Sequence, residues 1–160
     1  MRLHLLAVAR ERKADVLSGV AADYLSRAAA LAPGLGLRGP EARWVSPSRD
    51  HNPAREAEAL ATSISAGAVL LDERGAMLAS EDIAALIAAR RDGGARELSF
   101  CIGGANGFDP ALRKRVVAEG GTLLAFGRAV WPHALCRAMM AEQLYRALAI
   151  LAGHPYHRGA

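Results

Sequence analysis

The chain has 160 residues, of which 52% are hydrophobic and 22% charged, and its formal net charge is +4. This length predicts one domain over residues 1–160 with a sizeable core, and it argues against two domains. The aromatic content of 5% argues against a stacking platform for single-stranded RNA. The basic charge is carried mostly by arginine, and it fits either an acidic partner or a plain solvated surface.

The N-terminal stretch "MRLHLLAVARERK" has an apolar run that is too short for a secretion signal and is followed by charge instead of a cleavage site. No apolar run approaches the length of a membrane span. Cys101 and Cys136 lie far apart without metal-ligand neighbours, which predicts two buried thiols in a reducing compartment. We therefore expect a cytoplasmic protein without a membrane segment and without a bound metal.

Short β-like runs alternate with longer helical runs, which predicts an α/β sheet with helices on both faces. Asn52 before Pro53, Ser80 before two acidic residues and Asp109 before Pro110 mark helix starts. In chain order the expected elements are a strand at 3–8, a helix at 14–30, a break at 34–41, a strand at 42–47, a helix from 52, a strand at 68–73, a helix at 80–94, a strand at 97–104, a helix at 109–121, a strand at 122–127 and a helix at 133–153.

Glycines gather in the run "CIGGANGF", which follows one of these strands and precedes a helix. Alone this run predicts an ordinary turn, because its spacing matches neither the dinucleotide fingerprint nor a phosphate loop. However, the loops "LLDERG", "IGGANG" and "FGRAVWPHA" all follow strand ends, where ligands bind in open α/β sheets. Apolar side chains and close-approach backbone in these loops suit a neutral or cationic heterocyclic cofactor better than a triphosphate; the residues concerned are Leu71, Val130, Trp131, Gly103, Gly104 and Gly127.

The stretches "MRLHLLAVAR", "LLDERG", "FCIGGANGF", "WPHALCRAMMAEQLYRA" and "HPYHR" resemble the bacterial ribosomal RNA large-subunit methyltransferase H family, a small branch of the SPOUT methyltransferases. The resemblance implies an enzyme that depends on S-adenosyl-L-methionine and methylates N3 of a pseudouridine in 23S rRNA of assembled ribosomes. It also implies a homodimer and an α/β fold of the SPOUT type, with a mostly parallel sheet and a C-terminal trefoil knot.

Carried onto this chain, the resemblance implies cofactor contacts at two loop positions and along the run before the last helix. The implied residues are Leu71, Gly104, Gly127, Arg128, Ala129, Val130, Trp131 and Pro132, to which the loop pattern adds Gly103. The run "GRAVW" stands where members of the family are expected to carry a serine or threonine, so contacts by the backbone are expected here.

The C-terminal stretch "AGHPYHRGA" carries proton-transfer and anion-binding groups after Pro155 has ended the last helix. One interpretation makes Tyr156, His157 and Arg158 catalytic. His157 is then the general base that removes the N3 proton, because the unperturbed pKa of histidine suits this role near neutrality, and Arg158 holds a phosphate or stabilises the developing charge. The alternative is a tail that only fastens the end of the chain to the domain.

Two interpretations also remain open for the last helix. Glu142 and Arg146 have the spacing of a surface ion pair, whereas Arg146 or Arg137 in the other interpretation clamps an RNA phosphate. Apolar residues on this helix predict a dimer contact, namely Leu135, Met139, Leu144 and Leu148.

Two rival functions fit parts of the same sequence. A non-catalytic RNA- or ribosome-binding α/β module is the alternative to an enzyme. A doubly wound nucleotide-binding enzyme is disfavoured, because no glycine fingerprint follows the first strand.

Overall fold

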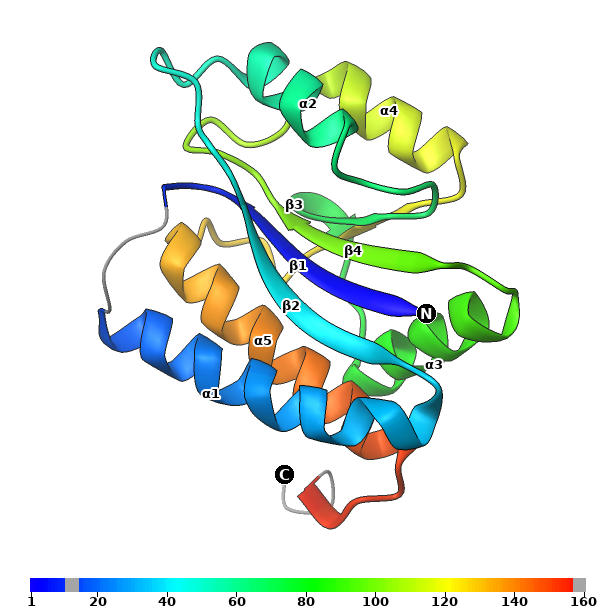
Figure 1. The fold of residues 1–160 in the computed structure, drawn as a ribbon. Helices are drawn as coiled ribbons and strands as arrows, with labels where there is room; N and C mark the ends of the chain where they lie inside the picture. The colour runs from blue at the N-terminus through cyan, green and yellow to red at the C-terminus, as the bar shows by residue number, and fades with distance from the viewer. Residues whose placement is uncertain (11–14, 157–160) are drawn as a thin grey trace.

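The structure is a computed structural model that describes residues 1–10 and 15–156 (Figure 1). Five parallel strands form one sheet in the order β2-β1-β4-β3-β5. In chain order the elements are β1 (Arg2–Val8), α1 (Val16–Leu31), a short 3-10 helix (Ala32–Leu35), β2 (Arg38–Val45), α2 (Pro53–Ala61), β3 (Val69–Ala76), α3 (Ser80–Asp92), β4 (Glu97–Ile102), α4 (Pro110–Ala118), β5 (Thr122–Leu124) and α5 (His133–Leu151).

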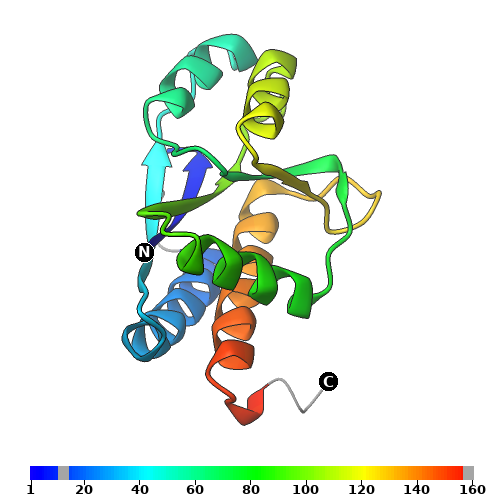
Figure 2. The same cartoon turned by 90° about the vertical axis from the view of Figure 1, so that its right-hand side faces the viewer.

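Helices cover both faces of the sheet, with α1, α3 and α5 on one face and α2 and α4 on the other (Figures 1 and 2). The strand β1 shows why, because its side chains alternate between two apolar clusters. Leu3 and Leu5 belong to the cluster that includes residues of α1, α3 and α5. Leu6 and Val8 belong to the cluster that includes residues of α2 and α4. The predicted α/β architecture is therefore confirmed.

Two of the predicted helix caps are confirmed and one is displaced. The side chain of Asn52 accepts hydrogen bonds from the first turn of α2, and that of Asp109 does the same for α4. Ser80 is not the cap of α3: the cap position is Ala79, whose N–H donates to the Asp82 carboxylate. Ser80 instead donates from Oγ to Oε1 of Gln143 at 2.8 Å, which joins α3 to α5.

The expected break at 34–41 is wrong in its second half, because β2 already begins at Arg38. The run contains Gly39 and Pro40, which locally indicate a turn. Proline is tolerated at the edge of a sheet, and β2 is an edge strand that pairs only with β1. The pairing slips between Arg2 and His4, where this Gly-Pro pair is accommodated.

The helix α5 packs against both α1 and α3 on one face of the sheet (Figure 1). Leu144 and Leu148 are fully buried in this packing, so they do not supply the surplus apolar surface on which the predicted dimer contact was based. Leu135 and Met139 remain half-buried. The homodimer and the trefoil knot stay predictions. Within the described ranges, no helix has the length and apolar character needed to cross a membrane.

Candidate active site

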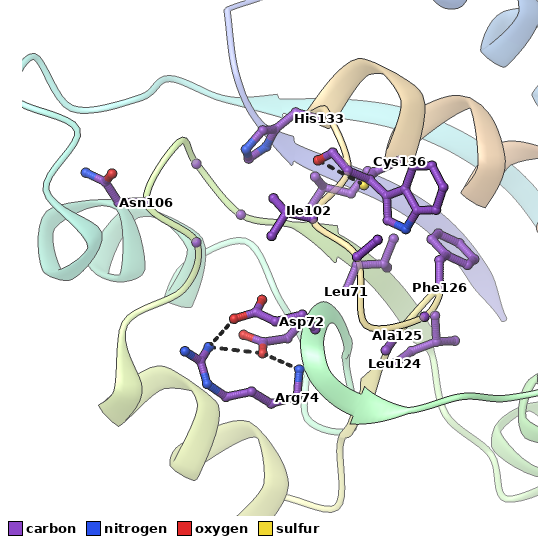
Figure 3. Close-up of a pocket in the computed structure, with 18 of the residues that line it drawn as sticks. Leu71, Asp72, Arg74, Ile102, Asn106, Leu124, Ala125, Phe126, His133 and Cys136 are labelled. Atoms are coloured by element: carbon purple, nitrogen blue, oxygen red, sulfur yellow. Dashed lines mark hydrogen bonds and ion pairs between the residues drawn. The ribbon is translucent and has the colours of Figure 1, made fainter.

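A pocket of about 350 Å³ lies at the carboxyl ends of β3, β4 and β5, beside the first turn of α5 (Figure 3). Leu71 of β3, Ile102 of β4 and Leu124 of β5 contribute to its wall. Because the strands are parallel, the loops that follow them meet at this edge of the sheet. The three stretches singled out in the sequence therefore line one pocket, but "LLDERG" lies within β3 (Val69–Ala76) and is not a loop.

The predicted cofactor-binding residues can now be placed. All of them line the pocket except Arg128 and Pro132; those that do are Leu71, Gly103, Gly104, Gly127, Ala129, Val130 and Trp131. Val130 is 89% exposed, so it contributes to the rim and not to a closed wall. Their role in binding a cofactor stays a prediction.

One side of the pocket is apolar and includes residues that the sequence did not single out. Phe126, Leu124 and Ile102 lie there, and Cys136 and His133 border it from α5 (Figure 3). Cys136 was expected to be buried, but it is only half-buried. Burial still raises the pKa of Cys136, so its thiol stays protonated near neutral pH and is a poor nucleophile.

The glycine loop closes on itself. The N–H of Gly107 donates to the carbonyl oxygen of Gly104 at 2.8 Å, and Gly107 has a φ of 71°. This is a left-handed conformation, which glycine adopts without steric cost. Gly103 is needed because the backbone of Gly107 lies close to it: an added Cβ at position 103 would lie 3.0 Å from the carbonyl carbon of Gly107. The loop therefore needs glycine for its own geometry.

The need for glycine at position 104 is explained by Glu56 of α2, a residue that the sequence patterns did not single out. The Glu56 side chain is buried, and an added Cβ on Gly104 would overlap its carboxylate. Oε1 of Glu56 accepts from the N–H of Ser48 at 3.1 Å, while Oε2 has no hydrogen-bond partner among the described residues. The missing side chain of Gly104 thus makes room for the carboxylate of Glu56.

A second contact fastens the same loop to the segment before α2. The side-chain Nδ2 of Asn106 donates to the carbonyl oxygen of His51 at 2.8 Å. Together with Glu56, this hydrogen bond ties the 103–107 loop to residues 48–51. Sequence patterns give no signal for such contacts, because they join residues that are far apart in the chain.

The opposite side of the pocket carries an ion-pair network around Asp72, a buried residue of β3 (Figure 3). Asp72 is 5% exposed and pairs with Arg113 of α4 at 2.5 Å and with Arg74 at 3.3 Å. Burial alone would raise the pKa of Asp72, but hydrogen bonds from the Arg74 N–H and from Arg113 outweigh it and lower this pKa. The carboxylate is therefore ionised and already neutralised by the protein.

The tail residue Tyr156 lies away from the pocket, in a cluster at the C-terminal half of α5. Its ring centroid is 4.6 Å from that of Tyr145, and its hydroxyl donates to Oε1 of Glu142 at 3.1 Å. The guanidinium of Arg146 pairs with Glu142 at 2.8 Å and stacks on the Tyr156 ring at 4.8 Å. The predicted ion pair of Glu142 and Arg146 is present. His157 and Arg158 lie outside the described residues.

The distance along α5 separates this cluster from the pocket. Tyr145 lies twelve residues after His133, which at the rise of an α-helix is about 18 Å. Tyr156 packed on Tyr145 therefore does not touch the pocket of its own chain. Among residues 1–10 and 15–156, no group of three or more histidine, cysteine or acidic side chains is arranged to hold a metal ion.

Comparisons with known proteins agree with this architecture. A family model described as a predicted SPOUT methyltransferase matches residues 1–157. The chain is similar to proteins called ribosomal RNA large subunit methyltransferase H, with 48% identity over 161 residues to that of Paracoccus denitrificans and 46% over 164 residues to that of Sinorhizobium fredii. A third, from Roseobacter denitrificans, is 45% identical over 160 residues. In each case the match covers 99% of both chains.

Proposed function

The chain belongs to the SPOUT methyltransferase family, and from this premise we propose that it methylates N3 of a pseudouridine in 23S rRNA. We further propose that S-adenosyl-L-methionine is the methyl donor, that the substrate is the assembled ribosome and that the enzyme works in the cytoplasm. The observation that carries the proposal is the pocket at the carboxyl ends of β3, β4 and β5, lined by most of the residues that the family resemblance implies.

The pocket suits this donor in size and chemistry. Its volume of about 350 Å³ falls in the range of small-molecule sites, which are mostly apolar with a few placed polar groups. Leu71 and Trp131 would hold a heterocycle by apolar contact, and the backbone at Gly103 and Gly127 would approach it closely. When bound, S-adenosyl-L-methionine supplies an electrophilic methyl group on a sulfonium.

The reaction also needs a base, because N3 lies between two carbonyl groups and is a weak nucleophile while protonated. We assign the removal of this proton to His157, whose residue type titrates near neutral pH. With the proton on His157, N3 would have a free electron pair for the methyl group, which the bound donor would supply while the electrons of the carbon–sulfur bond stay with its sulfur. Arg158 stabilises the negative charge that spreads over the imide oxygens.

The geometry of α5 adds a condition to this mechanism. Tyr156 is packed on Tyr145, about 18 Å along the helix from the pocket, and His157 is the next residue of the chain. We infer that a base on this tail acts on the pocket of a second copy. The proposed function accordingly requires the predicted homodimer.

A mixing experiment tests this arrangement. We expect His157→Ala to keep the melting temperature and the affinity for S-adenosyl-L-methionine but to lose methyl transfer to ribosomes by roughly 10²- to 10⁴-fold, as for a missing general base. A second variant with a blocked pocket, Gly127→Val, should be inactive for lack of cofactor. Mixed dimers of the two inactive variants should regain part of the activity, since one site per dimer then has an intact pocket and an intact tail.

Mass mapping of the 23S rRNA after methyl transfer tests the substrate itself. Ribosomes for this assay should come from a strain that lacks the corresponding gene. A methyl group on any atom other than N3 of a pseudouridine would contradict the proposal. Calorimetry with S-adenosyl-L-methionine separates it from the alternative of a non-catalytic RNA- or ribosome-binding module, which would bind ribosomes but show no heat with the cofactor.

A further inference from the structure

A second hollow of about 510 Å³ opens beside the pocket, and it shares Ala105 and His133 with it. It is bounded by the end of β1, the segment that leads into α2 and the first turns of α5. We call it the basic groove, because three arginines line it, namely Arg10, Arg49 and Arg137, against one acidic residue, Asp15. His51 and His133 also line it.

The three arginines of the basic groove form no ion pair with any described residue. Elsewhere many arginines are neutralised, as in the pairs of Arg113 with Asp72 and of Arg146 with Glu142. Asp15 is the one acidic residue among those that line the groove, and its Oδ1 already accepts from the N–H of Ser18 at the start of α1. The groove therefore keeps an excess of positive charge.

Arg137 is held in position by neutral groups. Its Nη2 donates to Oγ of Ser18 at 2.7 Å, and its guanidinium lies 4.7 Å from the ring centroid of Trp44. Neither contact cancels the charge. After the hydrogen bond from the Ser18 N–H, the charge of Arg137 contributes to lowering the pKa of Asp15, but Arg137 and Asp15 form no ion pair. Nε and Nη1 of Arg137 have no hydrogen-bond partner among the described residues. A stacked guanidinium with open donors is well suited to a phosphate, which it can contact through two parallel hydrogen bonds.

The wall of the basic groove that faces α5 is also held in place by contacts within the chain. His51 has a φ of 50°, a conformation that is uncommon for residues other than glycine. Its carbonyl oxygen accepts the hydrogen bond from Asn106 at 2.8 Å, which joins this wall to the glycine loop of the pocket. Backbone of this kind persists where surrounding contacts enforce it, and it is concentrated at ligand sites. The groove and the pocket thus share one fixed loop.

We propose that the basic groove binds a phosphate of the RNA strand next to the nucleotide that enters the pocket, with Arg137 as the main contact and Arg49 as the second. This inference rests on the proposed function, which supplies the RNA. The groove opens directly beside the pocket, so a strand whose target base enters the pocket continues past Arg137. Phosphate contacts position a strand without reading its sequence, so the groove fixes where the RNA lies and not which base is chosen.

Three single variants test the proposal: Arg137→Gln, Arg49→Gln and, as a control, Arg96→Gln. Arg96 is exposed, has no ion pair among the described residues and lies just before β4, at the amino ends of the strands, whereas the pocket lies at their carboxyl ends. Binding of ribosomes is measured at several salt concentrations. Each groove variant should reduce the slope of log K against log salt by about 0.7–1, as expected for one lost phosphate contact. Arg96→Gln should leave the slope close to that of the wild type.

Two further measurements distinguish a lost phosphate contact from a damaged fold or a general loss of charge. Affinity for S-adenosyl-L-methionine and the melting temperature should stay unchanged in Arg49→Gln, whose side chain makes no contact on which the fold depends. Arg137→Lys keeps the charge but loses the planar fork, so its salt slope should match the wild type while its affinity for ribosomes falls.

The outcomes separate this inference from the proposed function. Groove variants with the same salt slope as Arg96→Gln would overturn the groove and leave methyl transfer intact. A wild-type protein that binds ribosomes through the groove but transfers no methyl group would instead overturn the proposed function. Inorganic phosphate that displaced a short single-stranded RNA at low millimolar concentration would assign the groove to a free anion and also overturn the inference.

Discussion

The two ends of α5 each carry an arginine, and only one of these two arginines forms an ion pair with another described residue. Near the end of the helix, Arg146 forms an ion pair with Glu142 at 2.8 Å and stacks on the ring of Tyr156. Near its start, the guanidinium of Arg137 contacts Ser18 and Trp44 and forms no ion pair with any described residue. The sequence carries the reason, because Arg146 has an acidic residue four positions before it while Arg137 has His133 there. One end of the helix stabilises the chain, and the other end is available to a ligand.

This division separates stability from binding along a single element. At the C-terminal end Glu142, Arg146 and Tyr156 bind one another within the chain, which favours folding. At the N-terminal end the pocket and the basic groove leave polar groups and charge open. Substitutions at the two ends should therefore affect different measurements, and three predictions follow this division from the largest effect to the smallest.

Glu142→Ala should lower the free energy of unfolding by about 2–3 kcal/mol, because it leaves a half-buried arginine and the Tyr156 hydroxyl without their partner. Both side chains of the pair are 19% exposed, which places the loss below that of a fully buried pair. Chemical denaturation measures the effect. Arg49→Gln, at the open end, should change the same free energy by less than about 0.5 kcal/mol. Equal losses in the two variants would contradict the division.

Gly127→Ala should weaken the binding of S-adenosyl-L-methionine by roughly tenfold or more, since Gly127 has a φ of 110° that costs other residues about 1–3 kcal/mol. No atom lies within 4 Å of the place where the new Cβ would stand, so the cost comes from the backbone and not from a clash. Gly127 lies on the loop that leads into α5, at the open end of the helix.

Gly19→Ala is the matched control for that variant. Gly19 lies within α1, and its added Cβ would also meet nothing within 4 Å. Its helical backbone favours alanine by up to about 1 kcal/mol. Calorimetry should show unchanged cofactor affinity in Gly19→Ala, and an equally unchanged affinity in Gly127→Ala would remove this loop from the cofactor site.

Much of the fold could be predicted because its signals are local. Asn52 with Pro53 and Asp109 with Pro110 mark two helix starts through contacts within one turn. The convergence of three stretches of chain on one pocket follows from the parallel order of the strands. The start of β2 was misplaced because Gly39 and Pro40 obey a local turn rule, whereas the position of β2 at the edge of the sheet permits them.

The site was predicted less completely, for a physical reason. Which loops form it can be inferred from the sequence, but not what supports them. Glu56 fills the space beside Gly104, and Asp72 is neutralised by Arg113. The two residues of each pair are more than 40 positions apart, and helix or strand periodicity relates only residues that are close in sequence. The sequence predicts close approach of a ligand at Gly104 and gives no sign of Glu56, because a glycine shows only that a side chain is missing. It does not show which group occupies the space.

Tyr156→Phe should have the smallest effect, a loss of about 1 kcal/mol for one hydrogen bond to Glu142. Its pH dependence sharpens the comparison. Burial, then the Tyr24 hydroxyl and the charge of Glu142, raise the pKa of Tyr156 above its usual value of 10. The stabilisation from this group is therefore fully present below pH 10 and is lost as the pH rises further, because the unfolded chain ionises first. Melting temperatures between pH 8 and 11 should fall less steeply in Tyr156→Phe than in the wild type. Parallel curves would show that the hydroxyl is not enclosed, and the closed state of this end of α5 would then rest on Glu142 and Arg146 alone.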